Sequence, residues 1–128
     1  MSAKVRTVGD VSIVELSGEF TLGRTVARPL DLHGRRLEDL GQLLAGLLER
    51  KSVRIVLDLE RVRFMDSAGL GELVAWKKRA LQLGGDVRLL HPRERVRDLF
   101  ELTALTRVFR IFEDEAEAVA SFRASHAS

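Results

Sequence analysis

The spacing of hydrophobic residues changes several times along the chain, and each change predicts a new element. Apolar residues at 5–8 and 11–16 flank Gly9-Asp10, which predicts two strands joined by a tight hairpin turn. Leucines recur at three- and four-residue spacing over 37–48, which predicts a helix with one apolar face. Branched apolar residues are nearly continuous over 53–59, as in a central strand covered on both faces.

A longer helical pattern follows the strand at 53–59. It runs to about Leu83 and stops at Gly84-Gly85, because glycine commonly ends a helix. A short strand is predicted next, at 87–90. The apolar residues of this helix that we expect in the core are Leu70, Leu73, Val74 and Leu81.

The last third of the chain repeats the alternation of helix and strand. His91-Pro92 opens a helix, and a short strand is predicted at 108–112. Asp114, with Glu117 three residues later, is typical of a capping box at the start of a final helix. The residues expected to face inward are Val96, Leu99 and Phe100 in the first of these helices and Ala116, Val119 and Ala120 in the second.

The order of these elements predicts the fold class. Strands separated by helices require parallel pairing with right-handed crossovers. We therefore expect an α/β fold with a mostly parallel mixed sheet, an N-terminal hairpin strand and about four helices packed on it. Residues 1–128 are expected to form a single domain, in which Phe20 to Leu37 are a long connection or insertion.

Composition excludes several classes of function. The 128 residues include 21 basic and 19 acidic side chains, and a net charge of +2 does not favour nucleic acid as a partner. The basic clusters at 77–79 and 93–97 are interleaved with acids, so we expect them on solvated faces. There is no cysteine, and His33, His91 and His126 lack ligand spacing, so no metal or other cofactor is expected.

The chain shows no feature of a secreted or membrane-inserted protein. Its first residues lack the apolar stretch of a signal peptide, and no apolar run approaches the roughly 18 residues that cross a bilayer. We expect a cytoplasmic protein without membrane insertion.

The most informative segment is 64–71, Phe-Met-Asp-Ser-Ala-Gly-Leu-Gly, which we call the elbow. It places Ser67 at a helix N-terminus, where unpaired backbone N–H groups suit a serine oxygen or a phosphate. In the simpler interpretation Asp66 and Ser67 only cap the helix, a role worth about 1 kcal/mol. Gly69 and Gly71 each cost about 1 kcal/mol in helix propensity. They indicate close approach, either of the sheet or of another molecule.

Residues 58–71 resemble the signature of the STAS domain, as found in bacterial anti-sigma factor antagonists. Matches at 16–19, 84–85 and 96–105 extend the resemblance over most of the chain, from 11 to 122. The resemblance implies a binding switch. In such antagonists the serine after the motif's aspartate is phosphorylated by a partner anti-sigma factor that is itself a serine kinase, and the phosphorylated form releases that partner. Ser67 stands in that position, and a serine phosphatase would reset it.

The resemblance also implies where the partner binds. Two departures from the family pattern alter this surface: a second serine is replaced by Ala68, and an acidic residue after the second strand is replaced by Thr21. Trp76 is either a half-buried side chain at the core margin or an interface anchor. The partner-binding residues implied are Asp66, Ser67, Ala68, Gly69, Leu70 and Gly71 in the elbow, together with Glu19, Thr21 and Trp76.

Two other functions fit parts of the same pattern. STAS-like domains also serve as subunits of stress-signalling scaffolds or of lipid-transport machines, where Ser67 need not be phosphorylated. A serine hydrolase would need a general base for Ser67, either His33 or His91, and Met65 breaks the Gly-x-Ser-x-Gly spacing of a nucleophile elbow. We therefore expect a protein that is not an enzyme. The oligomeric state is left open.

Overall fold

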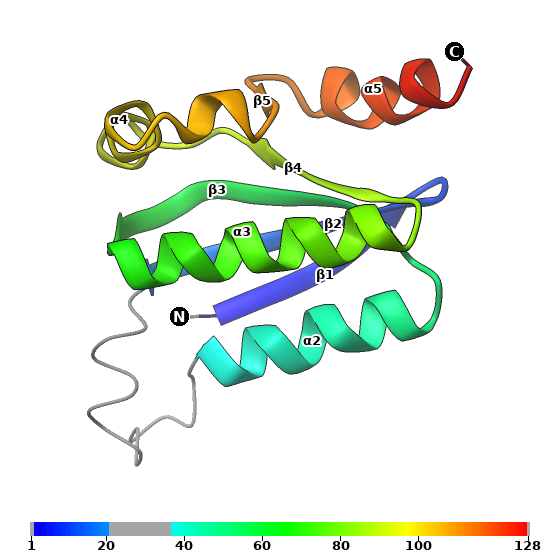
Figure 1. The fold of residues 1–128 in the computed structure, drawn as a ribbon, viewed down its shortest axis with the longest axis horizontal. Coiled ribbons are helices and arrows are strands. Elements are labelled where there is room, and N and C mark those ends of the chain that lie inside the picture. Colours follow the sequence, from blue (N-terminus) through cyan, green and yellow to red (C-terminus); the bar gives the residue numbers. More distant parts are fainter. Residues whose placement is uncertain (1, 21–36, 128) are drawn as a thin grey trace.

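Five strands form one mixed sheet in the part of the chain that the computed structural model describes, residues 2–20 and 37–127 (Figure 1). The strands lie in sequence order across the sheet. The first pair is antiparallel and the other neighbours are parallel. From edge to edge the strands are β1 (Ser2–Val8), β2 (Val11–Phe20), β3 (Arg54–Met65), β4 (Asp86–Leu90) and β5 (Ile111–Phe112). The predicted α/β class and the mostly parallel mixed sheet are confirmed.

Four α-helices accompany the sheet in the described residues. They are α2 (Leu37–Glu49), α3 (Ser67–Gln82), α4 (Glu94–Leu102) and α5 (Glu115–Ala127). Figure 1 shows α2 and α3 running side by side, with α5 beyond β4 on the opposite side of the sheet. The predicted long connection, Phe20 to Leu37, lies almost entirely outside the described residues, and so do Thr21 and His33.

Two apolar cores cover the two faces of the sheet. Alternate residues of β3 divide between them: Ile55 and Leu57 enter the larger core, and Val56 enters the smaller one. The larger core holds side chains of α2, α3 and α4, including Leu44, Leu47, Leu73, Val96 and Phe100. The smaller core lies under α5 and contains Val11, Ile13, Leu90, Ala118, Val119 and Phe122.

The central strand β3 is longer than the predicted 53–59. It continues to Met65 because β2 also continues, to Phe20, and the two strands stay paired through two register shifts. These irregularities break the alternation of buried and exposed residues along β3. The exposed charged residues at 60, 61 and 63 therefore do not show the pattern by which a strand is recognised in a sequence. The consequence is that the elbow emerges directly from the carboxyl end of β3.

Several predicted core positions are wrong. Leu81 is half exposed, because the buried stripe of α3 runs through Leu73, Trp76 and Ala80 and ends one residue before it. In α5 the buried residues are 118, 119, 121 and 122, so Ala116 and Ala120 lie outside the inward face. The Asp114 cap is present, since its carboxylate accepts the N–H of Ala116 at 3.1 Å.

The predicted last strand is also shorter than expected. Only Ile111–Phe112 pairs with β4, and a 3-10 turn at Leu105–Arg107 precedes it. Val108 is exposed, whereas Phe109 is buried and meets Phe100 edge to face, with ring centroids 5.7 Å apart. The apolar residues at 108 and 109 therefore belong to a loop that inserts one aromatic ring into the larger core.

Candidate functional site

The elbow joins the end of β3 to the first turn of α3. Met65 is buried at the end of the strand, and Asp66 is the N-cap of the helix, with extended backbone. The Asp66 carboxylate accepts the N–H of Gly69 at 2.7 Å. Asp66 thus fills the capping role, worth about 1 kcal/mol. Ser67 follows it as the first residue of α3, at the positive end of the helix dipole.

The end of β2 lies beside the elbow. Glu19 pairs with Phe64, and Phe20 pairs with Met65 in the parallel register of β2 and β3. The structure therefore brings Glu19 and the elbow to the same edge of the sheet, as expected for the carboxyl ends of neighbouring parallel strands. The side chains of Glu19, Ser67 and Ala68 lie outside the described part.

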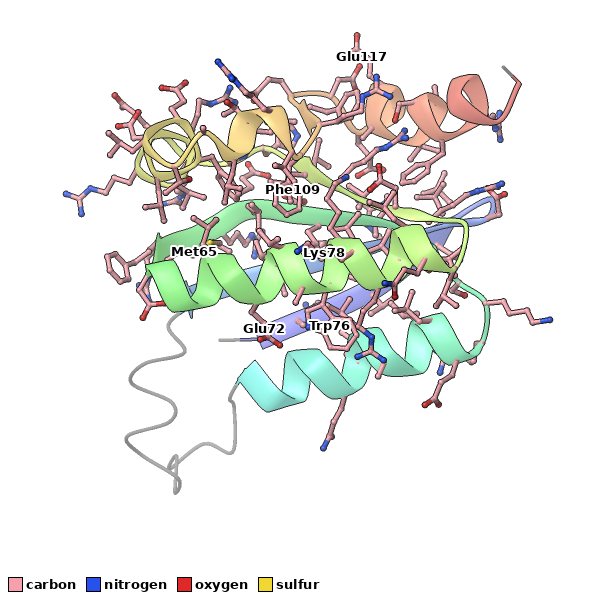
Figure 2. All side chains as sticks on the ribbon, viewed as in Figure 1. Met65, Glu72, Trp76, Lys78, Phe109 and Glu117 are labelled. Carbon is pink, nitrogen blue, oxygen red and sulfur yellow. The ribbon has the colours of Figure 1, made fainter. Side chains whose placement is uncertain are left out.

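Two of the expected partner-binding residues point into the core. Leu70 is buried, and Trp76 is only 7% exposed. The Trp76 indole Nε1 donates to Glu72 Oε1 at 3.0 Å, and Figure 2 shows both side chains between α3 and α2. Trp76 thus lies inside the larger core, deeper than the half-buried position at the core margin that the first interpretation gives it. We do not propose Leu70 or Trp76 as direct contacts of a partner.

The two glycines of the elbow differ in their surroundings. Gly69 is buried in the first turn of α3, where its N–H meets the Asp66 cap. Gly71 is exposed, and a Cβ added to it would meet nothing within 4 Å. The described part of the fold therefore gives no packing reason for the helix-propensity cost of Gly71. Close approach by another molecule would give one.

The geometry separates His91 from the elbow. Leu90 pairs with Asp58, which lies eight residues before Asp66 along β3. At about 3.3 Å per residue, His91 is therefore on the order of 20 Å from the elbow. Its Nδ1 lies 3.9 Å from Glu113 Oε2 instead. His91 cannot serve as the general base that a hydrolase would need at Ser67.

Asp58, at the start of the motif, is a half-buried carboxylate within β3. Burial raises the pKa of Asp58 above its ordinary value, and the N–H of Glu60, which donates to Asp58 Oδ1 at 3.1 Å, opposes that rise. This arrangement shapes the local backbone of β3 rather than the chemistry at Ser67.

The described residues lack the features of two other kinds of site. They contain no cluster of three or more His, Cys, Asp or Glu side chains that could hold a metal ion. None of their helices combines the length and apolar character needed to cross a membrane.

Known proteins resemble this chain in both sequence and fold. The model of the STAS domain matches residues 2–118 of this chain. The anti-sigma F factor antagonist of Paenibacillus polymyxa is 30% identical over 109 residues, which make up 85% of this chain and 84% of that protein. The crystal structure of TM1081 from Thermotoga maritima has a TM-score of 0.74 at 25% identity, and the match covers 94% of each chain.

A second solved relative shows the same fold at lower identity. The anti-sigma factor antagonist SpoIIAA in its unphosphorylated form has a TM-score of 0.64 at 20% identity, covering 95% of this chain and 98% of SpoIIAA. SpoIIAA of Bacillus is also known in its phosphorylated form, with a TM-score of 0.65 at 20% identity, covering 94% and 98%. The chain therefore belongs to the STAS domain family and, by homology, to its anti-sigma factor antagonists.

Proposed function

We propose that this chain binds an anti-sigma factor with serine kinase activity and is switched off when that kinase phosphorylates Ser67. In this way it would regulate transcription by a sigma factor in the cytoplasm. The observation that carries the proposal is the place of Ser67 as the first residue of α3, directly after a capping aspartate. That place matches the phosphate-accepting serine of the family motif.

A phosphate at this position is compatible with the fold. Phosphorylation adds about −1.5 to −2 charge at neutral pH, and a helix N-terminus favours negative charge. Asp66 already supplies the cap through its bond to Gly69, so the helix start does not have to be rebuilt. The effect of the phosphate would then be local: a strongly negative group on a docking surface.

Release of the partner follows from that local charge. A partner that places a carboxylate or an apolar patch over the elbow would be repelled or would have to desolvate the phosphate. SpoIIAA, which shares the fold, is known in both unphosphorylated and phosphorylated forms. This relative supports a switch in which one fold exists in two charge states.

The direct test uses intact mass spectrometry. The purified chain would be incubated with ATP and each kinase-type anti-sigma factor of its own organism. We expect a gain of one phosphate in the wild type and in Ser52→Ala, a control serine between α2 and β3, and no gain in Ser67→Ala. Ser67→Glu, which imitates the added charge, is expected to weaken binding at least about tenfold.

Three results would count against the proposal. Binding without any phosphate gain would favour the alternative, a STAS scaffold subunit of a stress-signalling or lipid-transport complex. Absence of binding to every such kinase, with the chain folded, would remove the anti-sigma partner altogether. Phosphate gain that persists in Ser67→Ala would place the switch at another residue.

Gly71 provides a separate prediction. Gly71→Ala is expected to stabilise the free chain by about 1 kcal/mol, because alanine is the better helix former and its Cβ meets nothing in the described fold. The same methyl group should weaken partner binding about tenfold if the partner approaches α3 closely. Urea unfolding and titration calorimetry measure the two effects.

The control for this prediction is Gly46→Ala in α2. A Cβ at Gly46 would make only ordinary contact with Arg50, at 3.6 Å, so it should also stabilise the chain. It lies on another helix and should leave partner affinity unchanged. Equal affinity for Gly71→Ala and Gly46→Ala would show that no partner packs against Gly71.

A further inference from the structure

A hollow lies beside the elbow, between the carboxyl end of β3 and helix α4. Its volume is about 220 Å³. Met65, labelled in Figure 2 at the end of β3 next to the first turn of α3, forms part of its floor. The residues that line this hollow, which we call the β3–α4 groove, are Phe64 and Met65 from β3 and Arg95, Val96, Asp98, Leu99 and Leu102 from α4.

The groove combines a buried apolar floor with exposed apolar edges. Val96 and Met65 are buried, whereas Phe64 is 46% exposed and Leu102 is 85% exposed. On α4 the lining residues follow helical spacing, at 95, 98, 99 and 102, so one stripe of the helix faces the groove. Large apolar side chains exposed on both edges of a hollow are typical of an interaction site.

The size of the groove indicates what it holds. Sites for small molecules and cofactors usually enclose about 300–1,000 Å³. A hollow of about 220 Å³ is smaller and suits one large apolar side chain inserted by another protein. Such anchors, seated in apolar pockets, carry most of the energy of many protein interfaces.

Two charged residues at the groove indicate which residues of the partner would lie beside the anchor side chain. Arg95 and Asp98 are exposed on α4, and neither forms an ion pair with any residue in the described part of the chain. Their charges are available to a partner. An acidic residue next to the anchor would pair with Arg95, and a basic one with Asp98, at the rim of the interface.

The groove is continuous with the elbow. Phe64 lies on its edge and precedes Ser67 by three residues, so a protein bound over the start of α3 also reaches the groove. We infer that the β3–α4 groove receives an apolar anchor side chain of the anti-sigma factor, flanked by charged residues that pair with Arg95 and Asp98. This inference rests on the proposed function and adds the contact that would give the complex its affinity.

The test compares two exposed leucines at helix ends. Leu102→Asp places a charge at the groove, and Leu83→Asp places the same charge at the far end of α3, where Leu83 is 56% exposed. Leu102 is the last residue of α4 and Leu83 is the C-cap of α3, and both are exposed, so the two substitutions place the same charge at comparable positions on the surface. We expect Leu102→Asp to weaken binding of the kinase-type anti-sigma factor at least about tenfold and Leu83→Asp less than about twofold. Phe64→Asp should act like Leu102→Asp.

A fluorescent probe gives a second readout. The chain has no cysteine, so Leu102→Cys and Leu83→Cys can each carry a single environment-sensitive dye. The dye at 102 is expected to shift to the blue when the anti-sigma factor binds, and the dye at 83 is not. A blue shift at 102 that depends on the concentration of the chain alone would assign the groove to a second copy and overturn the inference.

The outcomes separate this inference from the proposed function. If the wild type binds the anti-sigma factor, Ser67→Glu releases it, and Leu102→Asp binds like the wild type, the groove is not the docking site and the switch stands. If the wild type binds none of the kinase-type anti-sigma factors, the proposed function fails and the inference fails with it.

Discussion

Replacing Asp86 with alanine is expected to destabilise the chain by about 3–5 kcal/mol, a large part of the 5–15 kcal/mol that ordinarily holds a domain together. Asp86 is the first residue of β4, and its carboxylate is shared by two buried cations. Asp86 Oδ1 accepts a hydrogen bond from Lys77 Nζ of α3, and Asp86 Oδ2 accepts one from Arg88 Nε at 3.2 Å. Removing the carboxylate leaves both cations without that counter-charge inside the protein.

The two cations belong to opposite sides of the sheet, which makes Asp86 a connection between the layers. Lys77 lies 5.5 Å from the ring centroid of Phe109, in the larger core. Arg88 lies 4.1 Å from the ring centroid of Phe122, under α5, and donates to Ser121 Oγ at 2.5 Å. The loss of one side chain therefore disturbs the packing of α3 and α5 together.

Urea unfolding of Asp86→Ala and of Glu113→Ala measures this effect against a surface carboxylate. Glu113 is largely exposed and pairs with Arg97, so its replacement should cost no more than about 1 kcal/mol. Adding Lys77→Met to Asp86→Ala removes one of the two buried charges and should recover part of the lost stability. A loss for Asp86→Ala as small as that for Glu113→Ala would mean that water replaces the carboxylate at little cost.

This network marks the limit of what the sequence predicts about charge. Residues 77–79 are all basic, which predicts a solvated face, and Lys78 is exposed in agreement with that prediction. Lys77 is instead 7% exposed, because its aliphatic stem crosses the core to reach Asp86. Asp86 lies nine residues away in sequence, and only the pairing of β4 with β3 places it there.

The elbow was predictable because all of its signals are local. The capping aspartate and the helix that follows it lie within one continuous segment, so propensity and capping rules place both correctly, although β3 continues past its predicted end at Leu59 to Met65. The β3–α4 groove was not predictable in this way. Its walls, Phe64 and Leu102, are 38 residues apart, and single exposed apolar residues are common on protein surfaces. Only the fold shows that these two residues flank one hollow.

Gly85 shows how a local signal can conceal a tertiary one. In the sequence the pair Gly84-Gly85 predicts a helix stop, which suits Gly84, whose φ is +86°. Gly85 has a different role. A Cβ on it would lie 1.9 Å from the carbonyl oxygen of Val53, the residue directly before β3. The chain between α3 and β4 therefore passes so close to the backbone of β3 that only glycine fits.

Gly85→Ala is accordingly expected to destabilise the chain by about 3 kcal/mol or more, at or above the upper end of the range for overpacking. The atom in the way is backbone and cannot rotate aside, and it accepts the N–H of Asp86 at 3.0 Å. Relieving the clash must separate the starts of β3 and β4. Gly84→Ala is the control. Its Cβ would meet nothing within 4 Å, so the only expected loss of stability is about 1 kcal/mol, from placing alanine in the left-handed backbone conformation.

The separation of β4 from β3 connects the Gly85→Ala prediction to the Asp86→Ala prediction. Moving the start of β4 away from β3 also moves Asp86 away from Lys77, so Gly85→Ala already breaks part of the buried network. The double variant Gly85→Ala with Asp86→Ala should therefore lose less stability than the sum of the two single losses, whereas distant sites add. Urea unfolding of the wild type, the two single variants and the double variant measures the four free energies of unfolding that this comparison needs. Simple additivity, or a Gly85→Ala loss no larger than that of Gly84→Ala, would show that the chain relaxes around the new methyl group without moving β4.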